Sequence, residues 1–322
     1  MALLQGSEIS PKNDERVLTS LHGSIDEIVM ELRKLRAASL EYRQRHDAQP
    51  KLPSRKVLAR VVEGLSAALF PNRLGPPHLT DEGIDYYVGH LLDVTLRDLL
   101  SQVSRELRFT LGRENLDEAD QERAAAIVQT FAKRLPRIRA LLDSDIRAAY
   151  EGDPAARSID EVLVCYPGIT AIAHYRFAHE LHHLGTPLIA RMISDIAHSI
   201  TGIEIHPGAQ ISGSFFIDHG TGVVIGETAV IGEHVRLYQA VTLGAKRFPV
   251  DDHGTLVKGN LRHPIVEDNV VIYAGATILG RITIGRDSTI GGNVWLTRSV
   301  PPGSTVSQAQ ARYEVFDGRN GI

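Results

Sequence analysis

The second part of this chain repeats with a period of six residues. After residue 201 an aliphatic side chain stands at every sixth position over long stretches, and glycine follows several of these positions. An amphipathic helix would need apolar residues every three or four positions, whereas six is three times the strand period of two. The pattern is typical of a triangular solenoid in which each six-residue unit forms one short strand and one corner. The thirteen positions are Ile205, Ile211, Ile217, Ile225, Ile231, Leu237, Leu243, Val266, Ile272, Ile278, Ile284, Ile290 and Leu296.

Two interruptions break this period. Between Ile217 and Ile225 the step is eight residues, which places two extra residues around Asp218-His219-Gly220. Later the step from one aliphatic position to the next is 23 residues, so a long loop at about 246–264 must leave the coil. Long excursions from a rigid repeat commonly carry function. We expect Arg262-His263-Pro264, where the repeat resumes, to have a fixed role.

The residues before about 200 follow a helical pattern instead. Apolar residues recur three and four apart, and Gly185-Thr186-Pro187 separates two predicted helices at about 169–184 and 187–199. The sequence therefore predicts an α+β chain with an α-helical domain over 1–200 that serves assembly and contributes to the site near its end. A β-helix over 201–302 and a tail over 303–322 follow.

Composition narrows the classes of function. The formal net charge is −4, with 35 basic and 39 acidic residues, which provides neither a basic face for nucleic acid nor a polybasic membrane anchor. We find no signal peptide and no apolar run long enough to span a membrane, and we expect a cytoplasmic protein. The single cysteine, Cys165, excludes an intrachain disulfide and fits a reducing compartment; we expect it to be buried.

The motifs within the repeat resemble those of a known enzyme family. Residues 204–209 read Glu-Ile-His-Pro-Gly-Ala, and residues 217–232 contain Asp-His-Gly-Thr-Gly followed by Ile-Gly-Glu-Thr-Ala-Val-Ile-Gly. Together with Val241-Thr242-Leu243-Gly244, Arg262-His263-Pro264 and residues 274–280, they closely resemble the serine O-acetyltransferases of the hexapeptide-repeat family. The resemblance is dense from about Asp145 to Pro302 and includes helical runs such as Asp153-Pro154-Ala155 and His174-Tyr175-Arg176.

This resemblance implies a left-handed parallel β-helix and a reaction. The enzyme would transfer the acetyl group of acetyl-CoA to the hydroxyl of L-serine, giving O-acetyl-L-serine and CoA in cysteine biosynthesis. It implies that His219 is the general base and that Glu204, where the family more often has aspartate, fixes the imidazole. Transfer would be direct, through a ternary complex without an acyl-enzyme.

The resemblance also assigns binding roles. Arg262 would bind the carboxylate of serine with His263 beside it, and Asp153 and Asp218 would face the ammonium. No metal is expected. Arg281, Arg286 and Arg298 all remain open as partners of the nucleotide phosphates. The positions that would line the CoA groove are Gly244, Ala245, Ala274, Gly291 and Gly292.

The family further implies an assembly. We expect a homotrimer or a dimer of trimers with CoA between subunits. The terminal Ile322 after glycine suits binding to O-acetylserine sulfhydrylase, the enzyme that uses O-acetylserine. Feedback inhibition by cysteine is a further expectation, although the tail lacks the family's common Gly-Val-Pro-Ala run.

Three other interpretations compete with this one. A metal-dependent carbonic anhydrase could use His206, His219 and His263, but Arg262 would repel a cation. An acetyltransferase for a sugar or an aminoglycoside would share the repeat, yet two anions and one cation suit a zwitterion better than a polyol. A non-catalytic scaffold would not explain the two extra residues around Asp218-His219.

Overall fold

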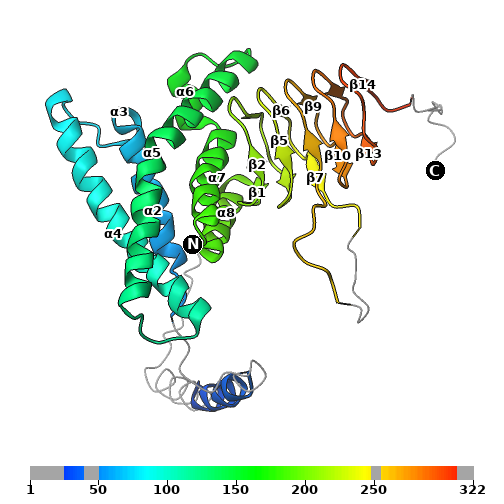
Figure 1. The fold of residues 1–322 in the computed structure, drawn as a ribbon. Helices are drawn as coiled ribbons and strands as arrows, with labels where there is room; N and C mark the ends of the chain where they lie inside the picture. The colour runs from blue at the N-terminus through cyan, green and yellow to red at the C-terminus, as the bar shows by residue number, and fades with distance from the viewer. Residues whose placement is uncertain (1–24, 40–50, 248–254, 310–322) are drawn as a thin grey trace, which may run out of the picture. The chain divides into compact units, whose positions relative to one another are not determined.

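The computed structural model describes residues 25–39, 51–247 and 255–309. The chain divides into two compact units, residues 1–50 and residues 51–322. In the first unit, residues 25–39 form a helix whose side chains are exposed. The second unit holds helices α2 to α8 and strands β1 to β14 (Figure 1).

Helices fill the second unit up to Thr201. Their ends follow from local signals: the Ser54 and Asp117 side chains cap helices by accepting backbone N–H groups, Gly112 ends one helix with φ 65°, and Pro167 and Pro187 begin two others. Among the described residues no helix is long and apolar enough to cross a membrane. The elements are α2 (Arg55–Leu69), α3 (Pro71–Leu74), the 3-10 turn η1 (Asp81–Gly83), α4 (Ile84–Leu111), α5 (Glu118–Gly152), α6 (Ile159–Cys165), α7 (Pro167–His183) and α8 (Pro187–Thr201).

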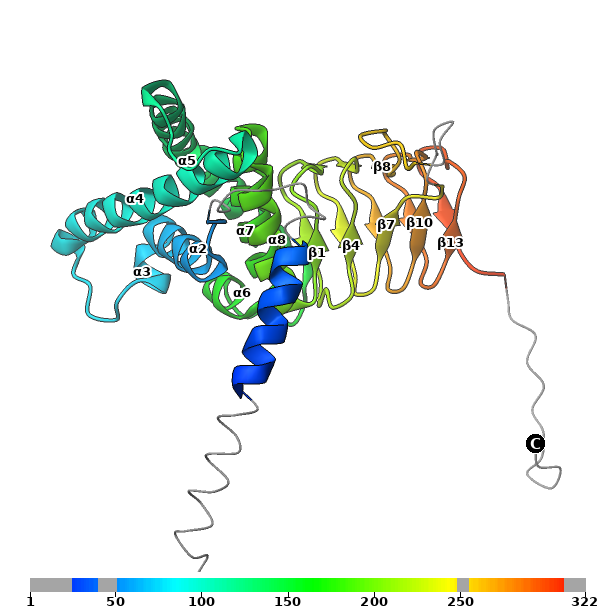
Figure 2. The same cartoon turned by 90° about the horizontal axis from the view of Figure 1, so that it is seen from below.

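Fourteen short parallel strands follow and stack into three sheets. The first sheet has the order β1-β4-β7-β10-β13, the second β2-β5-β8-β11 and the third β3-β6-β9-β12-β14. Figure 2 shows the strands of the first sheet in that order along the solenoid. The strands are β1 (Glu204–Ile205), β2 (Gln210–Ile211), β3 (Phe216–Ile217), β4 (Val224–Ile225), β5 (Val230–Ile231), β6 (Arg236–Leu237), β7 (Thr242–Gly244), β8 (Ile265–Val266), β9 (Val271–Ile272), β10 (Thr277–Leu279), β11 (Thr283–Ile284), β12 (Thr289–Ile290), β13 (Trp295–Leu296) and β14 (Thr305–Val306).

The period of six places its aliphatic side chains on the axis of this solenoid. In the first sheet Ile205, Ile225, Leu243, Ile278 and Leu296 lie in register, one per coil. Twelve of the thirteen predicted positions are buried, and burial of each such side chain stabilises the fold by about 1.5–3 kcal/mol. The structure confirms the expected fold class, helices followed by a left-handed parallel β-helix. The sequence pattern missed β14, which follows β13 after a step of ten residues.

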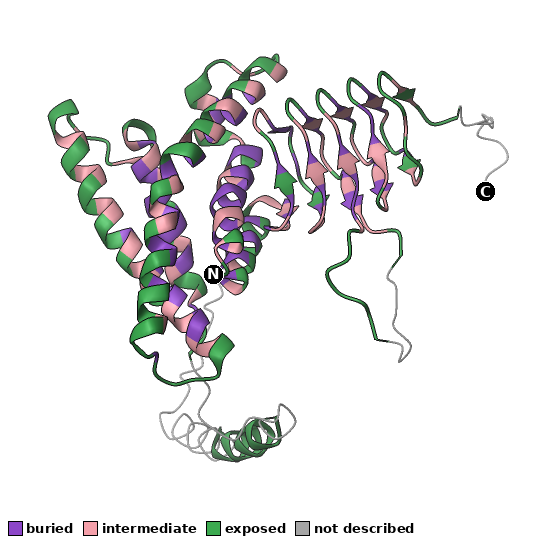
Figure 3. Ribbon diagram, in the orientation of Figure 1, coloured by how far each residue is buried: buried purple, intermediate pink, exposed green. Residues whose placement is uncertain are grey.

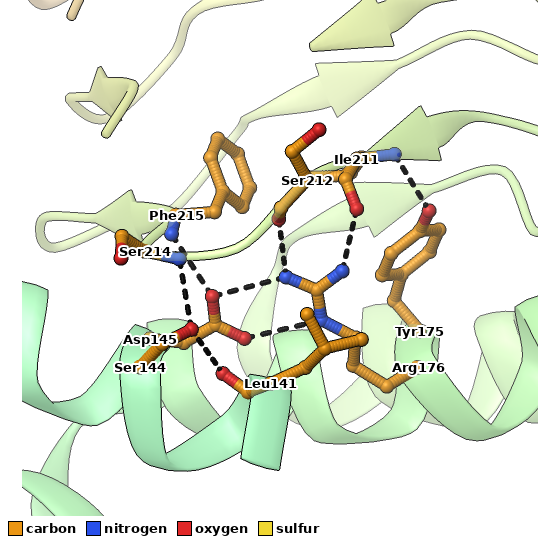
Figure 4. Close-up of polar contacts among 9 residues, drawn as sticks. All are labelled: Leu141, Ser144, Asp145, Tyr175, Arg176, Ile211, Ser212, Ser214 and Phe215. Atoms are coloured by element: carbon orange, nitrogen blue, oxygen red, sulfur yellow. Dashed lines mark hydrogen bonds and ion pairs between the residues drawn. The ribbon is translucent and has the colours of Figure 1, made fainter. Parts of the chain in front are cut away.

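The helices dock on the first coil through buried polar contacts (Figure 4). Arg176 of α7 binds the Asp145 carboxylate of α5 with both Nε and a terminal nitrogen, at 3.1 and 3.0 Å. The same guanidinium donates to the carbonyls of Ile211 and Ser212, and Asp145 accepts the N–H of Phe215 at 2.9 Å. Figure 3 shows that this junction and α7 are largely buried. The end of α5 is thereby fixed against the solenoid.

Candidate active site

Two edges of the prism carry the predicted side chains. We call the edge where strands of the third sheet lead into the first the His219 edge; it holds the corners at 218–223, 238–241, 273–276 and 291–294. The edge where the first sheet leads into the second is the Arg262 edge, and the long loop leaves the coil there. The two edges border opposite sides of the first sheet.

His219 lies in the extra residues of the first interruption. Its backbone is left-handed, with φ 58°, and Gly220 follows with φ 95°, where a Cβ would come within 2.4 Å of the Ile203 side chain. This tight turn leaves the imidazole 75% exposed, with Nε2 3.8 Å from a carboxylate oxygen of the buried Asp218. The histidine is therefore open to solvent beside an anion.

Asp153 lies close to this corner, after the C-terminus of α5. Its carboxylate accepts the Tyr166 hydroxyl at 2.5 Å and the N–H of Ala155 at 2.8 Å. These bonds, with smaller contributions from the charges of Arg236 and His219, hold the pKa of Asp153 below its ordinary value. The same contact raises the pKa of Tyr166 to about 12. Asp153 thus stays ionised beside His219.

Arg236 belongs to this cluster, and sequence reasoning missed it. Its guanidinium donates to Asp218 at 2.6 Å and to the carbonyl of Gly152 at 2.6 Å. The available signal was its place in the repeat, one residue before the aliphatic Leu237, which turns a charged side chain outward.

Glu204 opens β1, one coil below His219. The register pairs it with Val224, and its neighbour Ile203 packs beneath Gly220. Stacking thus brings the Glu204 segment under the His219 corner. The Glu204 carboxylate, however, forms an ion pair with Arg191, at 4.0 Å.

The Arg262 edge is built around Thr228. The Thr228 hydroxyl accepts the backbone N–H groups of both Arg262 and His263, at 2.9 and 3.1 Å, which fixes the end of the long loop. The Arg262 guanidinium binds Glu227 at 2.5 Å. Arg281 donates to the carbonyls of Thr228 and His263, so it braces the same corner.

His263 differs from His219 in burial and in charge. Only 6% of its surface is exposed, and its Nδ1 accepts the N–H of Thr228 at 3.0 Å. Burial, helped by the charge of Arg262, lowers the pKa of His263 to about 4. At neutral pH the ring is uncharged and carries its proton on Nε2, so it can donate a hydrogen bond but is a poor base.

The positions assigned to CoA divide between the same two edges. Gly244 and Ala245 lie at the Arg262 edge, next to a cavity of about 530 Å³. Ala274, Gly291 and Gly292 lie at the His219 edge, where a Cβ on Gly292 would come within 3.2 Å of the Ala274 carbonyl. Four basic residues line the cavity: Lys246, Arg247, Arg262 and Arg281.

The histidines of the metal hypothesis do not gather in one place. His206 and His263 lie at the Arg262 edge, and His219 lies at the other. In the part of the chain that the structure describes, no three His, Cys, Asp or Glu side chains are placed to hold a metal ion. Cys165 is exposed at the end of α6, so the expectation that it is buried was wrong.

The chain is similar to known proteins in sequence and in fold. Residues 263–298 match the bacterial transferase hexapeptide family model (six repeats). The chain is 54% identical over 98% of its length to the plasmid serine acetyltransferase of Synechococcus elongatus and covers 99% of that protein. Among solved structures, serine acetyltransferase isoform 3 of Entamoeba histolytica in complex with cysteine is 34% identical, with a TM-score of 0.68 over 84% of this chain and 86% of that one. A serine acetyltransferase in complex with CoA is 27% identical, with a TM-score of 0.51 over 79% of this chain and 98% of that one.

Proposed function

Because this chain belongs to the serine acetyltransferases, which transfer an acetyl group from acetyl-CoA to L-serine, we propose that its active site is completed between copies of the chain. The His219 edge of one copy would face the Arg262 edge of the next. The observation that carries the proposal is the division of both the serine-binding and the CoA-binding residues between two edges.

A single copy cannot hold both ends of one serine with these residues. The proposed ammonium partners Asp153 and Asp218 lie at the His219 edge, and the carboxylate partner Arg262 lies at the other. One face of the prism, about six residues or roughly 20 Å of extended chain, separates them. A threefold ring of copies joins unlike edges at each interface and closes on itself. We therefore propose a homotrimer, with a dimer of trimers through the helices as the larger form.

The exposed imidazole of His219 is suited to proton transfer. As the serine oxygen attacks the thioester carbon, His219 takes the hydroxyl proton; as the carbon–sulfur bond breaks, it returns that proton to the thiolate of CoA. Glu204, from the coil below, would orient the ring. The neutral His263 would donate its Nε2–H beside the charge of Arg262, which suits a carboxylate.

The basic cavity at the Arg262 edge suits the phosphates of CoA. It adjoins Gly244 and Ala245 and is lined by Lys246, Arg247 and Arg281. Of the three arginines left open by the sequence, Arg281 is the one that lines this cavity. We assign the phosphates to this group of cations.

A mixed assembly tests the split site directly. His219→Asn disables one edge and Arg262→Met disables the other, and each variant alone should have little activity when serine is well below the wild-type KM. Co-expression at equal levels should restore about a quarter of wild-type activity, because three-quarters of random trimers are mixed and each of these has one intact interface. The assay follows thiol release from acetyl-CoA with serine, and with homoserine, threonine and a sugar panel as alternative acceptors.

The activity of the co-expressed variants distinguishes a site shared between copies from a site within one copy. Refolding the two variants separately and mixing them without subunit exchange provides the control, which should stay inactive. If co-expression gives no more activity than the separate variants, all residues act within one copy and the proposal is wrong.

Three expectations complete the proposal. The related structures in complex with CoA and with cysteine support acetyl-CoA as the donor and cysteine as a ligand. We expect cysteine to inhibit the enzyme by binding at the serine site. The single cysteine fits a cytoplasmic location. Ile322, which lies outside the described residues, would bind O-acetylserine sulfhydrylase; deletion of Ile322 should abolish co-purification of the two enzymes, and unchanged co-purification would contradict this role.

A further inference from the structure

Arg236 joins two segments that lie far apart in the sequence. It stands on β6, and its two terminal nitrogens donate in different directions, one to Asp218 in the corner before β4 and one to the carbonyl of Gly152 at the end of α5. Both bonds measure 2.6 Å. Because Gly152 directly precedes Asp153, one guanidinium is bonded to both segments that carry the proposed ammonium partners.

Aromatic rings hold this guanidinium in place. Its central carbon lies 4.9 Å from the centre of the Phe216 ring and 4.6 Å from that of Tyr238. Tyr238 in turn stacks on Tyr273, with ring centres 5.0 Å apart and planes 11° from parallel. A side chain with this many partners has lost most of its rotamer freedom, so it can set the position of what it binds.

The backbone at Gly152 is shaped to allow this contact. A Cβ at residue 152 would lie 3.0 Å from the Phe216 ring and 3.7 Å from a terminal nitrogen of Arg236. The absence of a side chain at residue 152 therefore favours the close approach of the α5 terminus to β3 and β6. The Asp145–Arg176 pair anchors the same helix two turns earlier.

We propose that Arg236 is a positioning residue for serine, which holds Asp153 and Asp218 at the separation that an ammonium group requires. This inference rests on the proposed roles of those two carboxylates. Two carboxylates and one guanidinium leave one net negative charge, which matches one ammonium. Without the guanidinium the two carboxylates would repel each other and the α5 terminus would lose its bond to the corner.

Substitution of Arg236 should act on serine and spare the donor. Arg236→Met should raise the KM for serine about 10- to 100-fold, the size expected for charge-assisted bonds, with the KM for acetyl-CoA within about twofold and kcat within about fivefold. Arg236→Lys keeps the charge but cannot make both bonds in the same geometry, so it should recover part of the loss. If Arg236→Met does not fold, the KM values of Arg236→Lys are compared with those of the wild type instead.

Arg139 provides a matched control in the helical half. It donates to Asp143 at 2.9 Å and to the carbonyl of Leu69, and it lies over the Phe70 ring at 4.1 Å. Arg139→Met therefore removes a similar set of contacts away from both edges. It should lower the melting temperature while leaving both KM values unchanged. An equal rise in the serine KM in Arg139→Met would reduce the role of Arg236 to general stability and overturn the proposal.

A double-mutant cycle distinguishes positioning from direct contact. If Arg236 acts through Asp218, Arg236→Met should add less than about threefold to the serine KM in an Asp218→Asn background. Full multiplication of the effects in both the Asp218→Asn and the Asp153→Asn backgrounds would overturn the proposal, because Arg236 would then act on serine independently of the two carboxylates. If Asp218→Asn and Asp153→Asn leave the serine KM unchanged, the proposed ammonium site fails first. If they raise it and Arg236→Met does not, only the positioning role fails.

Discussion

The two edges of the solenoid each present a histidine beside charged groups, but in opposite states. His219 is 75% exposed in a left-handed turn, with an anion at 3.8 Å. His263 is 6% exposed, and Thr228 bonds to its Nδ1. Proton transfer needs a ring nitrogen that substrate can reach, whereas recognition needs a donor in a fixed direction. In the proposed mechanism one residue type therefore serves two chemical purposes, according to how the coil holds it.

The edges also differ in charge. Around Arg236 the His219 edge gathers the two carboxylates Asp153 and Asp218, while the Arg262 edge has a cavity lined by four basic side chains. Glu227 offsets part of that positive charge through its bond to Arg262. Edges of complementary charge favour each other across an interface between copies. They also suit the two ends of a zwitterion.

The largest effect should come from removing the exposed histidine. His219→Asn keeps a residue that tolerates the left-handed backbone, so the turn should persist. We expect kcat to fall about 10²- to 10⁴-fold, the range for a lost general base, with little change in either KM. Steady-state kinetics with serine and acetyl-CoA measure it.

His234 is the matched control for this substitution. It is also exposed and left-handed, with φ 56°, but lies at the third edge of the prism. His234→Asn should leave kcat unchanged. Full activity in His219→Asn would contradict the assignment of the base.

The next effect should come from the opposite edge. Arg262→Met removes the cation assigned to the carboxylate of serine, so the serine KM should rise about 10- to 100-fold. Arg97→Met breaks an exposed Arg–Asp pair of similar chemistry on α4, at 3.0 Å, and should leave that KM unchanged. An unchanged serine KM in Arg262→Met would contradict the proposal that the two edges bind opposite ends of serine.

Much of this arrangement could be predicted because the repeat is periodic. The aliphatic positions fixed the strands and the two interruptions pointed to His219 and Arg262, since each departure from a rigid coil has a definite place in it. The partners of those residues could not be predicted. Arg236 looked like any outward residue of a strand, and its bond to Gly152 spans 84 residues of sequence. Burial of His263 depends on Thr228 in the preceding coil. A contact of this kind cannot be predicted from the spacing of residues in the sequence.

A third prediction concerns the pH dependence of stability. The pKa of His263 is about 4 in the folded chain and about 6.5 when unfolded, so between these values the unfolded chain binds more protons. Stability should therefore fall as the pH drops from about 6.5 to 4, by about 2–3 kcal/mol for this group. Melting temperatures from pH 7 to 4.5 should decline less steeply in His263→Gln. Equal slopes would show that His263 does not stay neutral.

The smallest effect should come from substitution of Glu204. This prediction tests the contrast between the tightly bonded His263 and the exposed His219. Glu204 lies one coil below His219 and pairs with Arg191 at 4.0 Å, so in its proposed role it would orient the imidazole only weakly. Glu204→Gln should lower kcat about three- to tenfold, which is less than loss of the base itself. Glu233→Gln, an exposed carboxylate at the third edge, is the control and should have no effect. A loss as large as that in His219→Asn would mean that the carboxylate closes firmly on the ring during catalysis. The His219 edge would then be as rigidly built as the Arg262 edge.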